Sequence, residues 1–123
     1  MIYTSYFANI RNLPEHIVPI SISGKAPDGY KGLQYKKLAP KYDFFMEWKQ
    51  THDNNMYIRC FKEQVLSKLN LMQVLSELDR LSQGKAICLV CYEKPSDFCH
   101  RHIVAEWFNS QGVPCKEFEK GDS

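Results

Sequence analysis

The sequence predicts an α/β fold: a single three-layer domain with a small, mostly parallel sheet flanked by helices. Three observations predict it. The run from Ala86 to Cys91 is apolar on both faces, which is typical of a strand covered by helices on either side. Amphipathic helical segments precede and follow this run, and helix, strand, helix and strand alternate in the second half of the chain. The 123 residues match one hydrophobic core, so residues 1–123 form one domain.

The first elements are short. The β-branched and aromatic segment Ile2–Phe7 predicts a strand, and Asn9–Pro14 a loop or a single helical turn. Apolar and small polar residues alternate over Ile17–Ser23, which predicts a second strand. Because proline cannot donate a ladder hydrogen bond, Pro19 places this strand near an edge or at a bulge.

A long basic loop follows from Gly24 to Lys41, with five lysines against one aspartate. Loops longer than about 12–15 residues are usually functional or disordered. Lysines can grip phosphates, and Tyr30 and Tyr35 could add stacking surfaces. A solvated surface without a function is the alternative.

Three helices are predicted next, at Asp43–Gln50, Tyr57–Leu69 and Leu71–Gln83, from apolar residues three and four apart. Asn70 can cap the third helix, and Gly84 ends it.

After the strand Ala86–Cys91, a fourth helix is predicted over Phe98–Gln111, stopped by Gly112 and Pro114. Val113–Phe118 predicts a last short strand.

Composition narrows the class of protein. No apolar run approaches the roughly 18 residues that span a bilayer, and the first residues lack the pattern of a secretory signal. We therefore expect a cytoplasmic protein without a membrane partner. Five cysteines cannot all pair within one chain, and most are expected to be small buried residues. A net charge of +2 is too small to indicate nucleic-acid binding by itself.

The chemistry is expected between Cys91 and Arg101. In open parallel sheets, ligands bind beyond the carboxyl ends of the strands, and Cys91 ends the most apolar one. The polar loop Tyr92–Asp97 leads into a helix that opens with Cys99, and a helix N-terminus suits an anion. A cation there opposes the helix dipole, so Arg101 is expected either to bind an anion or to form a structural ion pair.

Helical geometry separates the two histidines of this segment. At 100° per residue, His100 falls on the buried face, with Cys91, Cys99 and Arg101 as candidates to share its pocket. His102 falls on the solvent-facing side, where Glu106 would form an exposed pair with it.

The spacing of residues in this segment bears on two kinds of site, a zinc site and a phosphatase loop. The pattern from Cys91 through Cys99 and His100 to His102 could suggest zinc, but it fits no common ligand spacing, so we expect no metal and no cofactor. A phosphatase loop needs an arginine where Asp97 stands.

Two pairings involve cysteine. Cys88 and Cys91 are three apart on a strand, point to opposite faces and should not meet. A nucleophilic pair of Cys91 or Cys99 with His100 remains open, beside the alternative of a buried cysteine and a histidine bonded to the backbone.

Other candidate ligand residues lie at or near the predicted strand ends or in the basic loop, where their polar groups could bind ligand oxygens. They are Ser5, Arg11, Ser21, Ser23, Lys25 and Tyr35.

The segment from Cys91 to His102, continuing to Trp107, resembles the signature of the bacterial and phage family called domain of unknown function 488. Ile2–Phe7, Ile20–Ser23 and Leu38–Pro40 match the same family in order. The resemblance implies a compact three-layer α/β fold. The resemblance assigns no roles to residues, but it identifies five motif positions: Cys91, Glu93, Cys99, His100 and Arg101. Glu93 stands at the strand's carboxyl end, where a general base or a ribose-binding acid would stand.

We therefore expect a protein that binds a nucleotide or another phosphorylated ligand at Cys91–Arg101, with Glu93, His100 and Cys91 as candidate catalytic residues and the basic loop closing the pocket. One alternative is a non-enzymatic nucleic-acid-binding module that uses Lys25–Lys41. Another is a phage or host protein-interaction factor.

Overall fold

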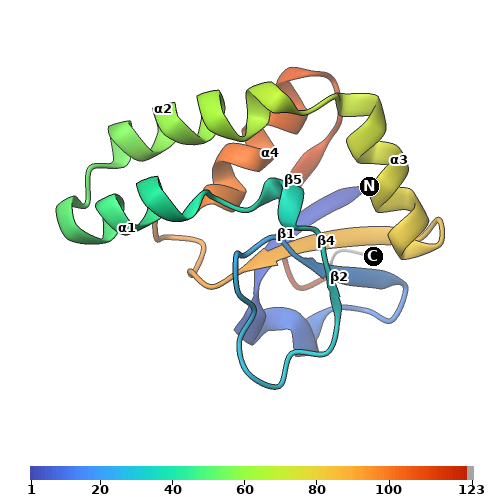
Figure 1. Cartoon of the computed structure of the whole chain (residues 1–123). Coiled ribbons are helices and arrows are strands. Elements are labelled where there is room, and N and C mark those ends of the chain that lie inside the picture. Colours follow the sequence, from blue (N-terminus) through green and yellow to red (C-terminus); the bar gives the residue numbers. More distant parts are fainter. Residues whose placement is uncertain (122–123) are drawn as a thin grey trace.

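The computed structural model describes residues 1–121 and contains, within them, a five-stranded parallel sheet in the order β3-β2-β4-β1-β5 (Figure 1). The strands are β1 (Ile2–Tyr6), β2 (Ile17–Ser21), β3 (Leu33–Gln34), β4 (Ala86–Cys91) and β5 (Cys115–Glu117). The predicted α/β class, with a small parallel sheet and helices packed against it, is confirmed. β4 occupies the centre of the sheet, and Ile87 to Cys91 are at most 5% exposed.

The α-helices are α1 (Tyr42–Thr51), α2 (Asn54–Gln64), α3 (Leu71–Ser82) and α4 (His100–Ser110). Short 3₁₀ turns, η1 (Phe7–Asn12), η2 (Lys36–Leu38) and η3 (Leu66–Lys68), join several elements. The helix predicted over Tyr57–Leu69 is wrong at both ends. It begins earlier because the Asp53 carboxylate accepts a hydrogen bond from Met56 N at 3.0 Å, and it gives way to η3 because Val65 and Leu66 turn into the core.

All four α-helices pack on one face of the sheet (Figure 1). Their apolar side chains, such as Phe61 and Phe108, form the main core with Ile87 and Leu89 of β4. The other face carries a smaller cluster that includes Val90 and is covered by residues of η1 and the C-terminal segment. The third layer is therefore thin, and the helical layer supplies most of the buried surface.

Pro19 lies in a strand that has neighbours on both sides, because β2 sits between β3 and β4. However, β3 pairs only with Ile20 and Ser21, so Pro19 has no β3 partner. Its carbonyl faces the Tyr30 hydroxyl at 3.5 Å, away from β4, and the missing N–H lies on that same side of the strand. The proline therefore costs no ladder hydrogen bond, as the prediction of an edge position requires.

The chain leaves β1 and β4 in opposite directions. From β1 it crosses one face through η1 to β2, and from β4 it crosses the other face through α4 to β5. Such a switch in direction opens a crevice at the carboxyl ends of the two strands, where ligands of open α/β sheets bind. Tyr6 and Cys91 are paired at this point. Within residues 1–121, no helix has the length and apolar character to cross a bilayer.

Candidate functional site

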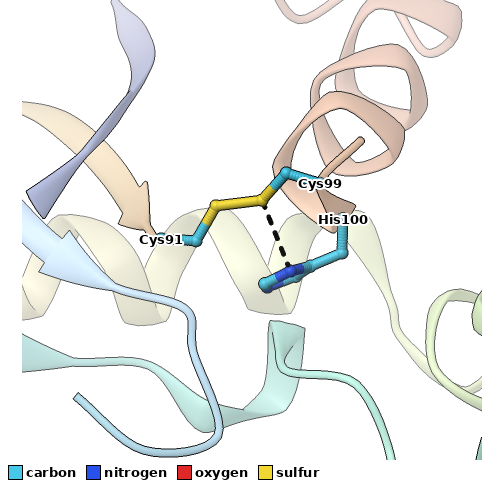
Figure 2. A group of neighbouring side chains, drawn as sticks. All are labelled: Cys91, Cys99 and His100. Carbon is cyan, nitrogen blue, oxygen red and sulfur yellow. Dashed lines mark hydrogen bonds between the residues drawn. A yellow bond between two sulfur atoms is a disulfide. The ribbon is translucent and has the colours of Figure 1, made fainter. Parts of the chain in front are cut away.

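Cys91, Cys99 and His100 meet at the carboxyl end of β4 (Figure 2). Cys91 ends the strand, Cys99 precedes the first residue of α4, and their sulfur atoms form a disulfide with the Cα atoms 7.6 Å apart. All three side chains are buried. Cys88 is a free thiol on the opposite face of β4, so the prediction that Cys88 and Cys91 do not meet is confirmed. The Cys91–Cys99 pairing was not predicted.

The protonation pattern of His100 follows from its two neighbours. Its Nε2 lies 2.7 Å from the Ile22 carbonyl oxygen, which can only accept a hydrogen bond, so Nε2 carries the proton. Nδ1 then presents its lone pair to Cys99 Sγ, 3.8 Å away. Burial lowers the pKa of His100 to about 4, and the side chain is neutral at pH 7. The predicted position of His100 on the buried face of the helix is confirmed.

Arg101 is fully buried and is bound by groups from three segments. Its Nε and Nη2 each donate to the Glu117 carboxylate at 3.1 Å, in a bidentate pair. Its Nη1 donates to the Cys91 sulfur at 3.1 Å and to the Glu93 carbonyl at 2.5 Å. Of the two roles expected for Arg101, the structural ion pair is the one observed. The guanidinium also places a positive charge against the Cys91 sulfur.

Glu117 was not among the predicted site residues. It lies in β5, and Thr4 Oγ1 of β1 donates to its Oε1 at 2.8 Å. Sixteen residues separate Arg101 from Glu117, and the contact exists only because α4 returns the chain to the sheet edge beside β1. A lone glutamate in a predicted strand carries no sequence signal for this role.

The loop from Tyr92 to Asp97 is exposed and anchored at both ends. Phe98 stacks on Trp48 at 5.4 Å and meets the Tyr57 ring edge-on at 5.1 Å. At the other end, Tyr92 Oη donates to the Lys25 carbonyl at 2.6 Å. The Glu93 side chain is exposed, and its charge is near enough to Tyr57 to add to the burial that raises the pKa of that phenol. Glu93 thus offers an accessible carboxylate in the loop that joins the two buried cysteines.

The predicted exposed pair of His102 and Glu106 is wrong. His102 is half-buried, because the loop brings the backbone of Pro95 and Asp97 to its ring, and burial lowers its pKa. Its Nε2 is buried with no hydrogen-bond partner among residues 1–121. Glu106 instead lies 3.6 Å from Lys62 Nζ of α2.

Ser23 differs from the other two candidate serines. The Ser5 hydroxyl accepts from Asn9 Nδ2 at 3.0 Å, and the Ser21 hydroxyl accepts from the backbone N–H of Ser23 at 3.3 Å. The Ser23 hydroxyl is buried and has no partner in the described part of the chain. Ser23 directly follows Ile22, whose carbonyl accepts the hydrogen bond from His100, so the Ser23 backbone adjoins the cysteine–histidine centre.

The remaining candidates are dispersed. Arg11 is exposed on η1. Lys25 is exposed and contributes only its carbonyl to the contact with Tyr92. Tyr35 is buried and donates to Glu77 of α3 at 2.5 Å, so it does not join the cysteine–histidine centre.

The basic loop lines a separate cleft of about 520 Å³ together with the α2–α3 junction. Exposed lysines surround it, and its wall includes Gly24, the neighbour of Ser23. These lysines are Lys36, Lys37, Lys41 and Lys68. Lys37 is paired with Glu77 at 2.9 Å. The segment Ser21–Gly24 therefore contacts both the cleft and the cysteine–histidine centre.

Comparison with known families gives one result. Residues 8–112 match the family model DUF488-N3a, described as the active DUF488-N3 subclade. The chain belongs to the DUF488 family. The resemblance in the segment from Cys91 to Trp107 is thereby confirmed, and most of that segment lies in the site described above. The comparisons found no similar curated protein and no similar solved structure.

The DUF488 match ends before Glu117. It includes Cys91, Cys99, His100 and Arg101, but the carboxylate that binds the arginine lies five residues beyond its last matched residue, 112. Glu117 is therefore a residue of this centre that lies outside the part of the chain matched by the family model.

Proposed function

We propose that this protein is an enzyme that binds a nucleotide or another phosphorylated small molecule at the carboxyl ends of β1 and β4. Its reactive centre is the group Cys91, Cys99 and His100. The observation that supports the proposal is that each of the two cysteine sulfurs lies against a polar side chain that can bind its proton or favour its thiolate. Nδ1 of His100 faces the Cys99 sulfur at 3.8 Å, and Nη1 of Arg101 contacts the Cys91 sulfur at 3.1 Å.

In the reduced protein these contacts act on each thiol differently. The neutral imidazole can accept a hydrogen bond from the Cys99 thiol at Nδ1, since Nε2–H is held by Ile22. The buried guanidinium favours the charged form of Cys91, and a thiolate is both the nucleophilic and the metal-binding form of cysteine. A cytoplasmic location, which we also propose, would keep the thiols reduced. The description of the matching subclade as active agrees with a reactive centre.

Three features support a phosphorylated ligand. The centre lies at the point where connections from β1 and β4 diverge, which is the usual ligand position in such sheets. Among residues 1–121 no side chain caps the N-terminus of α4, so its first N–H groups are suited to an anion. The buried Ser23 hydroxyl, which has no hydrogen-bond partner among residues 1–121, follows the Ile22 carbonyl that binds His100. The Glu93 carboxylate is exposed in the loop between the two cysteines, where a bound ligand could use it as an acid or a base.

Thermal shift of the reduced protein against nucleotides, sugar phosphates and their unphosphorylated counterparts tests this proposal. A ligand at one hundred times its Kd should add about 2.7 kcal/mol of stability. Ser23→Ala is the sharpest variant, because the hydroxyl it removes has no partner within the described residues. Ser110→Ala, on the exposed end of α4, is the matched control.

We expect a phosphorylated compound to stabilise the wild type and the control equally, and Ser23→Ala and Glu93→Gln more weakly. The proposal fails if no phosphorylated compound stabilises the reduced protein, or if both site variants bind the hit as well as the control does.

A nucleic-acid-binding module is the second candidate, and the lysine-lined cleft favours it. Lys36, Lys41 and Lys68 surround the cleft, and Tyr42 at its rim is 77% exposed, which leaves a ring free to stack on a base. Short oligonucleotides belong in the same screen. Stabilisation by oligonucleotides alone, lost when these three lysines are changed to glutamine and unaffected by Ser23→Ala, would replace the first proposal by this one.

A further inference from the structure

The cluster of Cys91, Cys99 and His100 has the composition of a metal site. Their ligand atoms, two sulfurs and one imidazole nitrogen, all lie within 4.8 Å of one another. Thiolate and imidazole are the ligands that zinc prefers in proteins. Three protein ligands are the number found in catalytic zinc sites, where the fourth position is left for water or substrate.

The separations suit a shared ion. With Zn–S near 2.3 Å and Zn–N near 2.0–2.1 Å, tetrahedral geometry separates a sulfur and a nitrogen ligand by about 3.6 Å and two sulfurs by about 3.8 Å. Cys99 Sγ and His100 Nδ1 are 3.8 Å apart. The Cα atoms of Cys91 and Cys99 are 7.6 Å apart, wider than the roughly 4.4–6.8 Å usual for bonded cysteines, so the reduced sulfurs can separate around an ion without the backbone opening.

The surroundings also match those of metal ligands. A metal-binding histidine normally donates its other N–H to a carboxylate, a carbonyl or water, which fixes its tautomer and orientation. His100 donates Nε2–H to the Ile22 carbonyl at 2.7 Å, which leaves Nδ1 free to bind. The Cys91 sulfur accepts a hydrogen bond from Arg101, and this contact offsets the charge of a buried thiolate.

We propose that the reduced protein binds one zinc ion through Cys91 Sγ, Cys99 Sγ and His100 Nδ1, with the fourth position available to water or a ligand. The proposal deepens the proposed function by naming a cofactor for the same centre. Reduction of the disulfide by a dithiol reagent supplies two electrons and two protons, and zinc binding then releases the two thiol protons to solvent. The disulfide and zinc-bound forms exclude each other.

The sequence pattern from Cys91 to His102, taken as one ligand set, fits no common zinc spacing. The structure groups Cys91, Cys99 and His100 without His102, and a ligand set joined by the loop Tyr92–Phe98 has no fixed spacing to recognise. His102 therefore serves as a control instead of a ligand.

The test is zinc content. Purified protein is reduced with a dithiol, stripped with a chelator, incubated with zinc sulfate and desalted under nitrogen, and its zinc is measured by elemental mass spectrometry. We expect about one zinc per chain for the wild type and for the controls Cys88→Ser and His102→Asn. Cys99→Ser and His100→Asn should hold a small fraction of that. Oxidised wild type should hold none.

Cobalt(II) titration gives a readout at the site itself. Thiolate-to-cobalt charge-transfer absorption with the intense visible bands of a tetrahedral ion is expected in the reduced wild type, and should be absent or altered in Cys91→Ser and His100→Asn. Circular dichroism of each stripped variant shows whether it is folded, and only folded variants are compared.

Two results would overturn the zinc proposal: a reduced wild type that takes up neither zinc nor cobalt, or folded ligand variants that bind as much zinc as the controls. Neither measurement uses a phosphorylated ligand. If the protein binds zinc but no compound in the ligand screen, the metal site stands and the proposed function is rejected. If a phosphorylated compound binds but zinc does not, the proposed function stands and the metal site is rejected.

Discussion

Glu117→Gln should destabilise the protein strongly, because it leaves a buried charge without its counter-ion. The Arg101 side chain has no exposed surface, and Glu117 accepts two of its hydrogen bonds at 3.1 Å. Removing one partner of a buried ion pair typically costs about 3–5 kcal/mol. Glutamine keeps one oxygen acceptor, and the Glu117 side chain is 24% exposed, so water can reach the site. We therefore take the lower end, about 3 kcal/mol.

The assay is urea unfolding of the variant and the wild type, both held in the same redox state. An unfolding entropy of about 2.1 cal/mol/K per residue corresponds to about 0.26 kcal/mol/K for this chain, so 3 kcal/mol lowers Tm by about 12 °C. Glu106→Gln is the matched control. Its ion pair with Lys62 spans 3.6 Å between side chains that are 73% and 53% exposed, and its loss should change stability by at most about 0.5 kcal/mol.

A double substitution tests whether the two charged side chains stabilise the protein through their contact with each other. Replacing both charges removes the unpaired ion, so Arg101→Met with Glu117→Met should cost less than the sum of the two single changes. The reasoning is refuted if Glu117→Gln is no less stable than Glu106→Gln, since a buried guanidinium cannot lose its carboxylate without a cost. Strict additivity in the double variant would show that the two side chains do not interact.

Two further predictions concern titration and reactivity. Burial lowers the pKa of His100 from 6.5 to about 4. Between these pH values the unfolded state binds a proton at this histidine and the folded state does not. The free energy of unfolding of the metal-free protein should therefore fall by about 3 kcal/mol from this group as pH falls from 6.5 to 4. Urea unfolding across this range should show a shallower pH slope in His100→Gln, and an unchanged slope would contradict the assignment. Burial also raises the pKa of Cys88 and of Cys115 to about 12, so iodoacetamide at pH 7.5 should label the partly exposed Cys60 first in the folded, disulfide-bonded protein. Mass spectrometry of digests measures the order, and labelling of Cys88 or Cys115 as fast as Cys60 would refute it.

The fold was predictable from the sequence because its strongest signals are local. The apolar run of β4 and the periodic helix α3, with Asn70 accepting from Gln73 N at 3.0 Å, are each specified by neighbouring residues. Boundaries failed where a distant contact decides them. The end of α2 depends on Val65 and Leu66 entering a core that includes residues of β1 and β4.

The candidate site was located but not resolved by the sequence. The position of Cys91 at the end of β4 and the buried face of His100 followed from strand and helix geometry. The contacts that control charge did not follow. Ile22 binds His100 across 78 residues and Glu117 binds Arg101 across 16, and neither has a spacing that a sequence can reveal. The same holds for the cysteine pair, because the loop between them has no periodicity.

The stability of this site and its reactivity depend on the same contacts. Arg101 connects Glu117 at the end of β5 to the Cys91 sulfur at the end of β4, and Thr4 of β1 holds Glu117 in place. Loss of the carboxylate would leave the guanidinium free to move, and the charge that favours the Cys91 thiolate would move with it. Glu117→Gln should therefore slow alkylation of Cys91 in reduced, metal-free protein as well as lower stability. If stability falls while the alkylation rate is unchanged, Arg101 is only a structural residue and does not control the thiolate.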